Sequence, residues 1–249
     1  MARGHFIITG ASKGIGEQLA GMLLDLGHQV IGIARGTSER LRGYSNYTHR
    51  SFDLSEIMGV DALLREIIND VNIDDSKIFC LINNAAVLEP LKPIERCTAQ
   101  EIQQHLQVSL AAPMVVSSSF IRHTEHFDIR RKIINITSGS GMYPAPGMSV
   151  YCTAKAGINM FTQCVGAEQA SQPRPVEIIA VDPGMVETQL QAAARGKDEQ
   201  DFGMAKYFRQ AYETGQVQSA EELGRYLLKI IENEYPTGKL VHYSKMDES

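Results

Sequence analysis

Short apolar runs alternate with amphipathic helical patterns along most of this 249-residue chain. Runs rich in isoleucine and valine are the expected strands, and they lie at residues 6–9, 30–34, 78–83, 132–137, 176–181 and 239–243. Apolar residues at helical spacing mark the segments between them, most clearly at residues 16–26, 57–71 and 220–232. Because such alternation is typical of parallel sheets with helices on both faces, the pattern predicts one α/β domain over residues 1–249. The expected sheet is doubly wound and has about seven strands.

Charge and composition exclude several classes of partner. The formal net charge is −5, and no run of lysine and arginine is long enough to follow a phosphate backbone, so we expect no nucleic-acid partner. No stretch approaches the roughly 20 apolar residues that a membrane span needs, so no membrane partner is expected. The four cysteines are scattered, which predicts no disulfide framework and favours a reducing, cytoplasmic location. His123 and His126 have no further ligand-type cluster near them in sequence, and no metal site is predicted.

A glycine-rich loop follows the first expected strand and opens the first expected helix. It reads Thr9-Gly10-Ala11-Ser12-Lys13-Gly14-Ile15-Gly16. Glycines allow a sharp strand-to-helix turn and a close approach of the backbone to a pyrophosphate, whose charge then meets the free N–H groups of the helix start. A glycine triad alone is weak, but the strand before it and the helix after it favour a dinucleotide site built from this loop.

The end of the second expected strand indicates which dinucleotide binds. Sites specific for NAD place an acid there, about 20 residues beyond the glycines, to hold the ribose 2′-hydroxyl. This chain has Arg35 instead, and no carboxylate before Glu39. Arg35 and Lys13 can both bind a 2′-phosphate, although either could equally be an ordinary solvated charge. The missing acid and the two cations together favour NADP(H).

Three polar residues form a candidate catalytic group. Tyr151 and Lys155 are one helical turn apart and share a face, and Ser138 stands at the end of an expected strand, where ligands of open α/β sheets bind. A phenol with an ordinary pKa of about 10 is a poor acid at neutral pH. A nearby ammonium is expected to lower that pKa, so that Tyr151 can give a proton to a carbonyl oxygen while Ser138 holds it.

These motifs, taken in order along the chain, resemble the short-chain dehydrogenase/reductase family and imply a single-domain Rossmann fold. The resemblance implies that Asp53 and Leu54 flank the adenine, and that Lys155 also grips the nicotinamide ribose. It places the segment Asn83-Asn84-Ala85-Ala86 against the other ribose, with Ala86 where the family usually has glycine. It further implies that the nicotinamide carboxamide meets the segment Asp182-Pro183-Gly184-Met185-Val186-Glu187-Thr188, through the Val186 backbone and the Thr188 hydroxyl.

One position departs from the family in a way that concerns proton transfer. The family usually has an asparagine in the central helix, which helps to hold a water that links the lysine to solvent. Ser109 stands at that place in this chain. Either its hydroxyl or a backbone carbonyl would have to take over, so the relay is in doubt while the hydride step is not.

Finer similarity points to one branch of the family. Residues 81–86, 91–95, 110–114 and 151–165 resemble the sepiapterin-reductase-like branch, and most of all the bacterial benzil reductases that form (S)-benzoin. This implies NADPH-dependent reduction of one carbonyl of a 1,2-diketone to a chiral hydroxyketone. The alternatives are a related reductase acting on sepiapterin, a 3-oxoacyl group or an alcohol, and a non-enzymatic dinucleotide-sensing protein.

The substrate side is expected to be apolar and covered by a lid. Met142, Tyr143, Met148, Met185 and Leu190 flank the catalytic residues and would give an adaptable wall, although at least half of them could equally be core or lid packing. Residues 189–215 are polar, interrupted by glycines and expected to act as the lid. The expected helices at 101–122 and 151–168 have wide apolar faces, and by analogy with the family they predict a homodimer or homotetramer.

Overall fold

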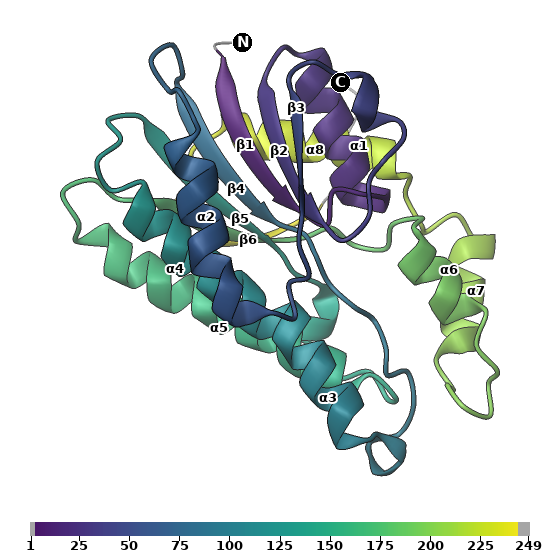
Figure 1. Cartoon of the computed structure of the whole chain (residues 1–249). Helices are drawn as coiled ribbons and strands as arrows, with labels where there is room; N and C mark the ends of the chain where they lie inside the picture. Colours follow the sequence, from purple (N-terminus) through teal and green to yellow (C-terminus); the bar gives the residue numbers. More distant parts are fainter. Residues whose placement is uncertain (1–2, 244–249) are drawn as a thin grey trace.

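The computed structural model describes residues 3–243 and confirms the doubly wound α/β fold (Figure 1). Its seven strands form one sheet in the order β3-β2-β1-β4-β5-β6-β7, and all neighbouring pairs are parallel. The strands are β1 (Gly4–Thr9), β2 (Gln29–Ala34), β3 (Tyr47–Ser51), β4 (Ile78–Asn83), β5 (Arg130–Ile136), β6 (Glu177–Asp182) and β7 (Leu240–His242).

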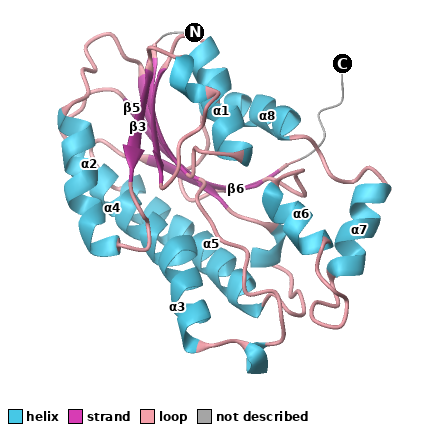
Figure 2. Cartoon of the chain, turned by 45° about the vertical axis from the view of Figure 1, so that its right-hand side comes forward, coloured by secondary structure: helices cyan, strands magenta, loops and turns pink. Residues whose placement is uncertain are grey.

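Helices cover both faces of the sheet (Figures 1 and 2). One face carries α1 (Gly14–Asp25) and α8 (Ala220–Glu232), and the other carries α2 (Val60–Asn69), α4 (Ala112–His123) and α5 (Ser149–Ala170). Side chains alternate between the two cores along each strand. In β1, Phe6 and Ile8 pack with α1 and α8, whereas Ile7 between them packs with α2 and α4. Burial on both sides explains why these strands read as continuous apolar runs.

The strand β3 was missed because it lacks that apolar signature. Its sequence is YTHRS, and none of its residues is fully buried. It pairs with β2 alone, at the edge of the sheet, where polar side chains are tolerated and protect an exposed strand. The described chain also contains short 3-10 helices at Leu41–Gly43, Ile57–Gly59, Ile94–Arg96 and Gly139–Gly141.

The expected continuous helix at 101–122 is wrong in one detail. It consists of α3 (Ala99–Leu106), a π-helical segment (Gln107–Ala111) and α4. Pro113 has no N–H, so it cannot donate to the carbonyl of Ser109 four positions earlier, as a regular helix requires. The wider turn lies where Ser109 packs, and such π segments are common at functional sites.

Residues 189–215 contain two helices, α6 (Gln189–Arg195) and α7 (Ala205–Glu213). Both project from the side of the domain, away from α2 and α4 (Figure 1). No helix was expected in this segment because its sequence is mostly polar, but α7 is amphipathic and buries Ala205 and Ala211. Across residues 3–243, no helix combines the length and apolarity that crossing a membrane would demand.

Candidate active site

The predicted site residues gather at the carboxyl edge of the sheet. Strand order reverses between β1 and β4, and the loops that follow these two strands therefore diverge to opposite sides. The glycine loop follows β1, the segment beginning at Asn84 follows β4, Ser138 follows β5, and Pro183 follows β6. Since all strands are parallel, these loops lie along the same edge. This brings together residues that are far apart in the sequence.

The glycine loop has the geometry of a phosphate-binding turn. Gly10 and Gly14 have positive φ angles of 70° and 60°, which disfavour other residues. A Cβ atom on Gly16 would lie 2.5 Å from the carbonyl oxygen of Gly10, so the turn closes only with glycine there. A Cβ on Gly14 would instead meet only the Thr188 side chain, whose Cγ2 would lie at 3.7 Å and Cβ at 3.9 Å, so there is room beside this backbone for a ligand. The loop and the start of α1 thus fit the pyrophosphate of a dinucleotide.

Side chains at the ends of β1 and β4 hold this loop in place. The Thr9 hydroxyl accepts hydrogen bonds from the backbone N–H groups of Asn84 (3.0 Å) and Ala85 (3.1 Å). The Asn84 amide donates back to the carbonyls of Thr9 and Gly10. Asn83 points the other way, into the core, where its amide donates to Ser117 and Asn135. Its side chain therefore braces the sheet, and only Asn84 and Ala85 face the loop.

The two predicted cations follow different strands and have different partners. Arg35 is 71% exposed at the end of β2 and lies 3.7 Å from the Asp53 carboxylate. Leu54, beside that aspartate, is 7% exposed and packs into the core with α2. Lys13 precedes α1, and its ammonium donates to Gln189 at the start of α6 (2.8 Å). Arg35 remains available to an anionic ligand, whereas Lys13 joins the glycine loop to the segment 189–215.

Ser138, Tyr151 and Lys155 are brought together as predicted. Ser138 takes an extended conformation after β5, and Tyr151 and Lys155 lie in the first turns of α5. The hydroxyls of Ser138 and Tyr151 share a hydrogen bond. The Lys155 ammonium lies 5.6 Å from the centre of the Tyr151 ring and donates to the Ile136 carbonyl at 2.8 Å. Strand β5 thus fixes both partners of the tyrosine.

The prediction that Tyr151 has a lowered pKa is wrong: the surrounding protein groups raise it. Burial raises the pKa of Tyr151 to about 12, and the hydrogen bond from Ser138 only partly opposes this. Burial also lowers the pKa of Lys155 to about 8, with Asp182 partly opposing it. The cost of burying charge exceeds the attraction between ammonium and phenolate across this distance. Tyr151 therefore holds its proton firmly at neutral pH, and Lys155 is charged below about pH 8.

The turn between α3 and α4 packs behind the tyrosine. The buried Ser109 hydroxyl accepts a hydrogen bond from the Val87 N–H (3.1 Å), so it ties the π segment to the loop after β4. One turn earlier, His105 is fully buried, its Nδ1–H donates to the Glu89 carbonyl (2.7 Å), and its ring meets the Tyr151 ring edge-on at 5.9 Å. No local motif in the sequence singles out His105, because its partners Glu89 and Tyr151 come from distant segments.

The segment after β6, which is expected to meet the carboxamide, lies next to the glycine loop. Thr188 caps α6 by accepting from the Gln191 N–H, and its methyl group is the nearest neighbour of Gly14. Gly184 has a φ of 67°, and the Pro183 carbonyl accepts a hydrogen bond from the Gln218 side chain. Val186 is buried and bridges to Gln218. The predicted segment is thus in place, anchored by a glutamine that the sequence did not single out.

The residues predicted to form the substrate wall differ in exposure. Met142, Tyr143 and Leu190 are 43%, 70% and 42% exposed. Met148 is buried, in an apolar cluster against which Tyr151 packs, and Met185 is partly buried. The other buried members of that cluster were missed because they come from distant segments, and they are Leu88, Leu91, Ala194, Phe202 and Ala205.

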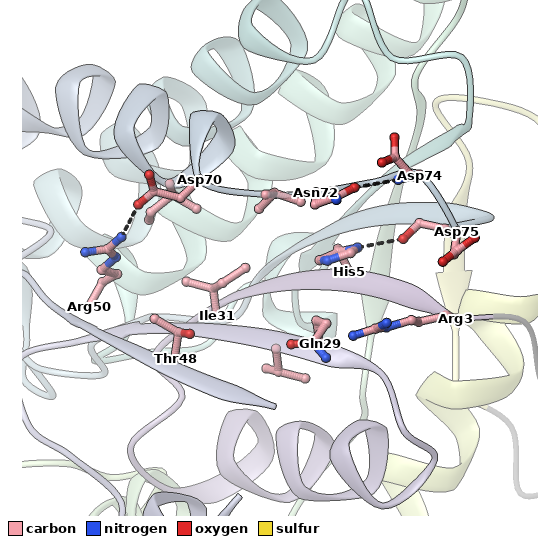
Figure 3. A pocket seen from close by; sticks show the side chains of 14 residues that line it. Arg3, His5, Gln29, Ile31, Thr48, Arg50, Asp70, Asn72, Asp74 and Asp75 are labelled. Atoms are coloured by element: carbon pink, nitrogen blue, oxygen red, sulfur yellow. Dashed lines mark hydrogen bonds and ion pairs between the residues drawn. The ribbon is translucent and has the colours of Figure 1, made fainter. Parts of the chain in front are cut away.

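A separate pocket lies at the opposite edge of the sheet (Figure 3). It has a volume of about 510 Å³ and opens near the amino ends of β1 and β2 and the end of α2. Two pairs of its polar groups are in contact, Arg50 with Asp70 (2.7 Å) and His5 with Ser76 (2.8 Å). None of the predicted site residues lines this pocket.

Comparisons with known proteins agree with this geometry. The short chain dehydrogenase family model matches residues 5–199. The benzil reductase ((S)-benzoin forming) of Bacillus cereus is 36% identical over 243 residues, which cover 95% of this chain and 98% of that protein. Its counterpart from Bacillus subtilis is 32% identical, covering 94% and 96%. The crystal structure of the KRED1-Pglu enzyme superposes with a TM-score of 0.82 at 21% identity, covering 95% of this chain and 99% of the other.

Proposed function

This chain belongs to the short chain dehydrogenase family, and we propose that it reduces one carbonyl of a 1,2-diketone to a chiral hydroxyketone with NADPH. The observation that carries this proposal is the convergence of Ser138, Tyr151 and Lys155 beside a glycine loop that fits a dinucleotide. The similarity to two benzil reductases over nearly the whole chain supports the diketone as substrate.

The proposed chemistry gives each of the three residues one role. NADPH, when bound, supplies the hydride that attacks the carbonyl carbon. The Ser138 hydroxyl donates a hydrogen bond to the carbonyl oxygen and orients it toward Tyr151. The Tyr151 hydroxyl gives its proton to that oxygen, which is a far stronger base than a phenolate once it carries negative charge. The Lys155 ammonium then stabilises the phenolate electrostatically.

Reprotonation of Tyr151 is proposed to involve the π segment. The Ser109 hydroxyl is engaged by Val87, so it is less suited to hold a water. The Ser109 carbonyl lacks its regular helical donor because Pro113 has no N–H. A carbonyl in that state can accept a hydrogen bond from a water on the path to Lys155. We therefore assign the relay to the Ser109 backbone in place of the side chain.

NADPH is proposed over NADH on the basis of charge at the end of β2. The exposed Arg35 guanidinium can pair with a 2′-phosphate, and the nearby Asp53 already engages it weakly at 3.7 Å.

Replacing Arg35 with glutamate should raise the KM for NADPH at least about tenfold, since each charge-assisted contact contributes on the order of 1.5–3 kcal/mol. The KM for NADH should not rise, because its ribose carries no phosphate; an equal rise for both cofactors would contradict the assignment.

A direct assay tests the proposed reaction. The chain is mixed with NADPH and benzil or 1-phenyl-1,2-propanedione, and NADPH consumption is followed by absorbance. Tyr151→Phe should lose at least about a hundredfold in kcat, because a general acid contributes 10²–10⁴-fold. Tyr44→Phe is the matched control, since the Tyr44 hydroxyl donates to Asp25 at the end of α1 and lies outside the predicted site. Reduction that survives Tyr151→Phe, or no turnover of any dicarbonyl despite NADPH binding, would refute the proposal.

The assembly and location of the protein are also proposals. Met114 on α4 and Met160 on α5 are 39% and 59% exposed, which supports a homodimer or homotetramer built on these helices. Light scattering on the purified chain tests this, and a Met160→Lys variant should dissociate the assembly. The four cysteines are free thiols, which supports a cytoplasmic location.

A further inference from the structure

The apolar cluster beside Tyr151 is closed by an aromatic ring from the segment 189–215. Phe202 lies between α6 and α7 and is fully buried, although the four residues before it in sequence are polar. It packs in one cluster with Leu88 and Leu91 from the loop after β4 and Met148 from the start of α5. Tyr151 packs against the same cluster. The ring therefore belongs to the apolar cluster that borders Tyr151.

The loop before α5 is shaped to receive this ring. A Cβ atom on Gly147 would lie 3.0 Å from Phe202 Cδ2, closer than side chains normally pack. Gly147 also has a φ of 79°, so both its conformation and its contact call for glycine. The Gly147 backbone therefore packs directly against the Phe202 ring.

Ion pairs near the ring contribute less to this arrangement than the ring itself. Lys197 pairs with Glu89 at 2.6 Å, and Arg96 pairs with Asp201 at 3.5 Å. All four side chains are more than a third exposed, and ion pairs in water contribute little. Complete burial of a phenylalanine is worth considerably more. Burial of Phe202 therefore holds this segment more strongly than the two ion pairs do.

We infer that Phe202 is a specificity-determining residue, whose ring occupies the space that the substituent on a carbonyl substrate needs next to Tyr151. The inference rests on the proposed reduction of 1,2-diketones and refines it. A methyl substituent can be accommodated with little displacement of the ring, whereas a phenyl group has to replace it. The chain as it stands should then favour small diketones, and loss of the ring should favour diaryl ones.

A substrate-size series tests the inference. kcat/KM is measured for 2,3-butanedione and for benzil in the unmodified chain, Phe202→Leu and Phe202→Ala. The benzil-to-butanedione ratio should rise at least about tenfold in Phe202→Ala and by less in Phe202→Leu, in line with the apolar volume removed. Tyr207→Ala, at a half-exposed position on α7, is the matched control and should leave the ratio unchanged.

A second measurement does not depend on turnover. The chain has no tryptophan, so Phe202→Trp introduces a single fluorescent reporter at this position. Its emission should be at short wavelength in the free protein and move to longer wavelength when benzil and NADP⁺ are added, because the ring is displaced toward water. An unchanged ratio in Phe202→Ala, or a reporter that stays buried with benzil bound, would overturn the inference. Failure of the unmodified chain to reduce either diketone would instead refute the proposed function.

Discussion

Two buried lysines near opposite ends of β5 have different environments: Lys132 on β5 has the environment of a structural residue, and Lys155 on α5 that of a functional one. Lys132, at the amino end, is fully buried and bonds to the Glu177 carboxylate (2.8 Å) and to the carbonyls of Ile230 and Asn233. Lys155, which packs against the carboxyl end, is 5% exposed. Among residues 3–243, Ile136 offers its ammonium the one hydrogen-bond acceptor.

The two lysines differ in how many of their ammonium N–H groups have a hydrogen-bond acceptor. Lys132 has acceptors for all three of its N–H groups and an opposite charge, as a structural ion pair requires. Lys155 keeps N–H groups for a ligand and has no carboxylate in contact within the described chain. Burial lowers the pKa of both lysines, but only for Lys132 does a bonded carboxylate oppose it. A buried charge with incomplete partners is costly, so its presence indicates function.

The largest effect on activity is expected when the charge of Lys155 is removed, which tests its proposed functional role. Lys155→Met should lower kcat/KM for a diketone by about 10²–10⁴-fold, because the phenolate of Tyr151 loses its stabilising cation. Thermal stability should be unchanged or higher, since an incompletely paired buried charge is removed. Steady-state kinetics and a melting curve check both parts; a destabilised variant that retains activity would mean that Lys155 is structural.

Removing the charge of Lys132 should have the opposite outcome. Lys132→Met leaves Glu177 buried with Arg130 as its remaining cation, so the cost should be about 3 kcal/mol, at the low end for a broken buried pair. Activity of the folded protein should remain within about twofold, since the site lies at the far end of the strand. Urea denaturation measures the loss. Adding Glu177→Leu should recover part of the stability, and the hypothesis is wrong if it does not.

The pH dependence sharpens the comparison further. The pKa of Lys155 is about 8, so kcat/KM should fall by about tenfold per pH unit above that value as the ammonium is lost. Lys155→Arg should abolish this limb of the profile, because a guanidinium keeps its charge. The folded protein binds fewer protons at Lys155 than the unfolded chain between about pH 8 and 10.5, so this group makes stability rise over that window. A profile flat to pH 10 would contradict the assigned role.

The smallest effect is expected at Ser109. Asparagine can accept the Val87 N–H as the serine hydroxyl does, and the backbone carbonyl is unchanged. Ser109→Asn should therefore leave turnover within about tenfold of the unmodified chain, because the relay contributes less than the proton donor. Single-turnover and steady-state rates measure this, with Ser118→Asn on the exposed face of α4 as control. A hundredfold change in either direction would show a specific role for the Ser109 side chain.

The local elements were largely predictable from the sequence. Six of the seven strands were expected because each contains a short apolar run, which reflects burial against the helices. The polar edge strand β3 and the helix α7 carried no such signal. The turn in the central helix was foreseeable from Pro113, but its π geometry was not. Local pattern thus predicted elements that face a core and missed those that face water.

The sequence by itself determined the chemical groups and their local spacing: a glycine turn after a strand, a tyrosine and a lysine on one helical face, and an arginine where an acid is usual. Only the tertiary structure decided what surrounds them. Burial sets the pKa values of Tyr151 and Lys155, and packing places His105 against the tyrosine ring and Phe202 in the apolar cluster that borders it. The physical reason is that spacing acts through the backbone over a few residues, whereas desolvation and contact depend on every segment that folds over the site.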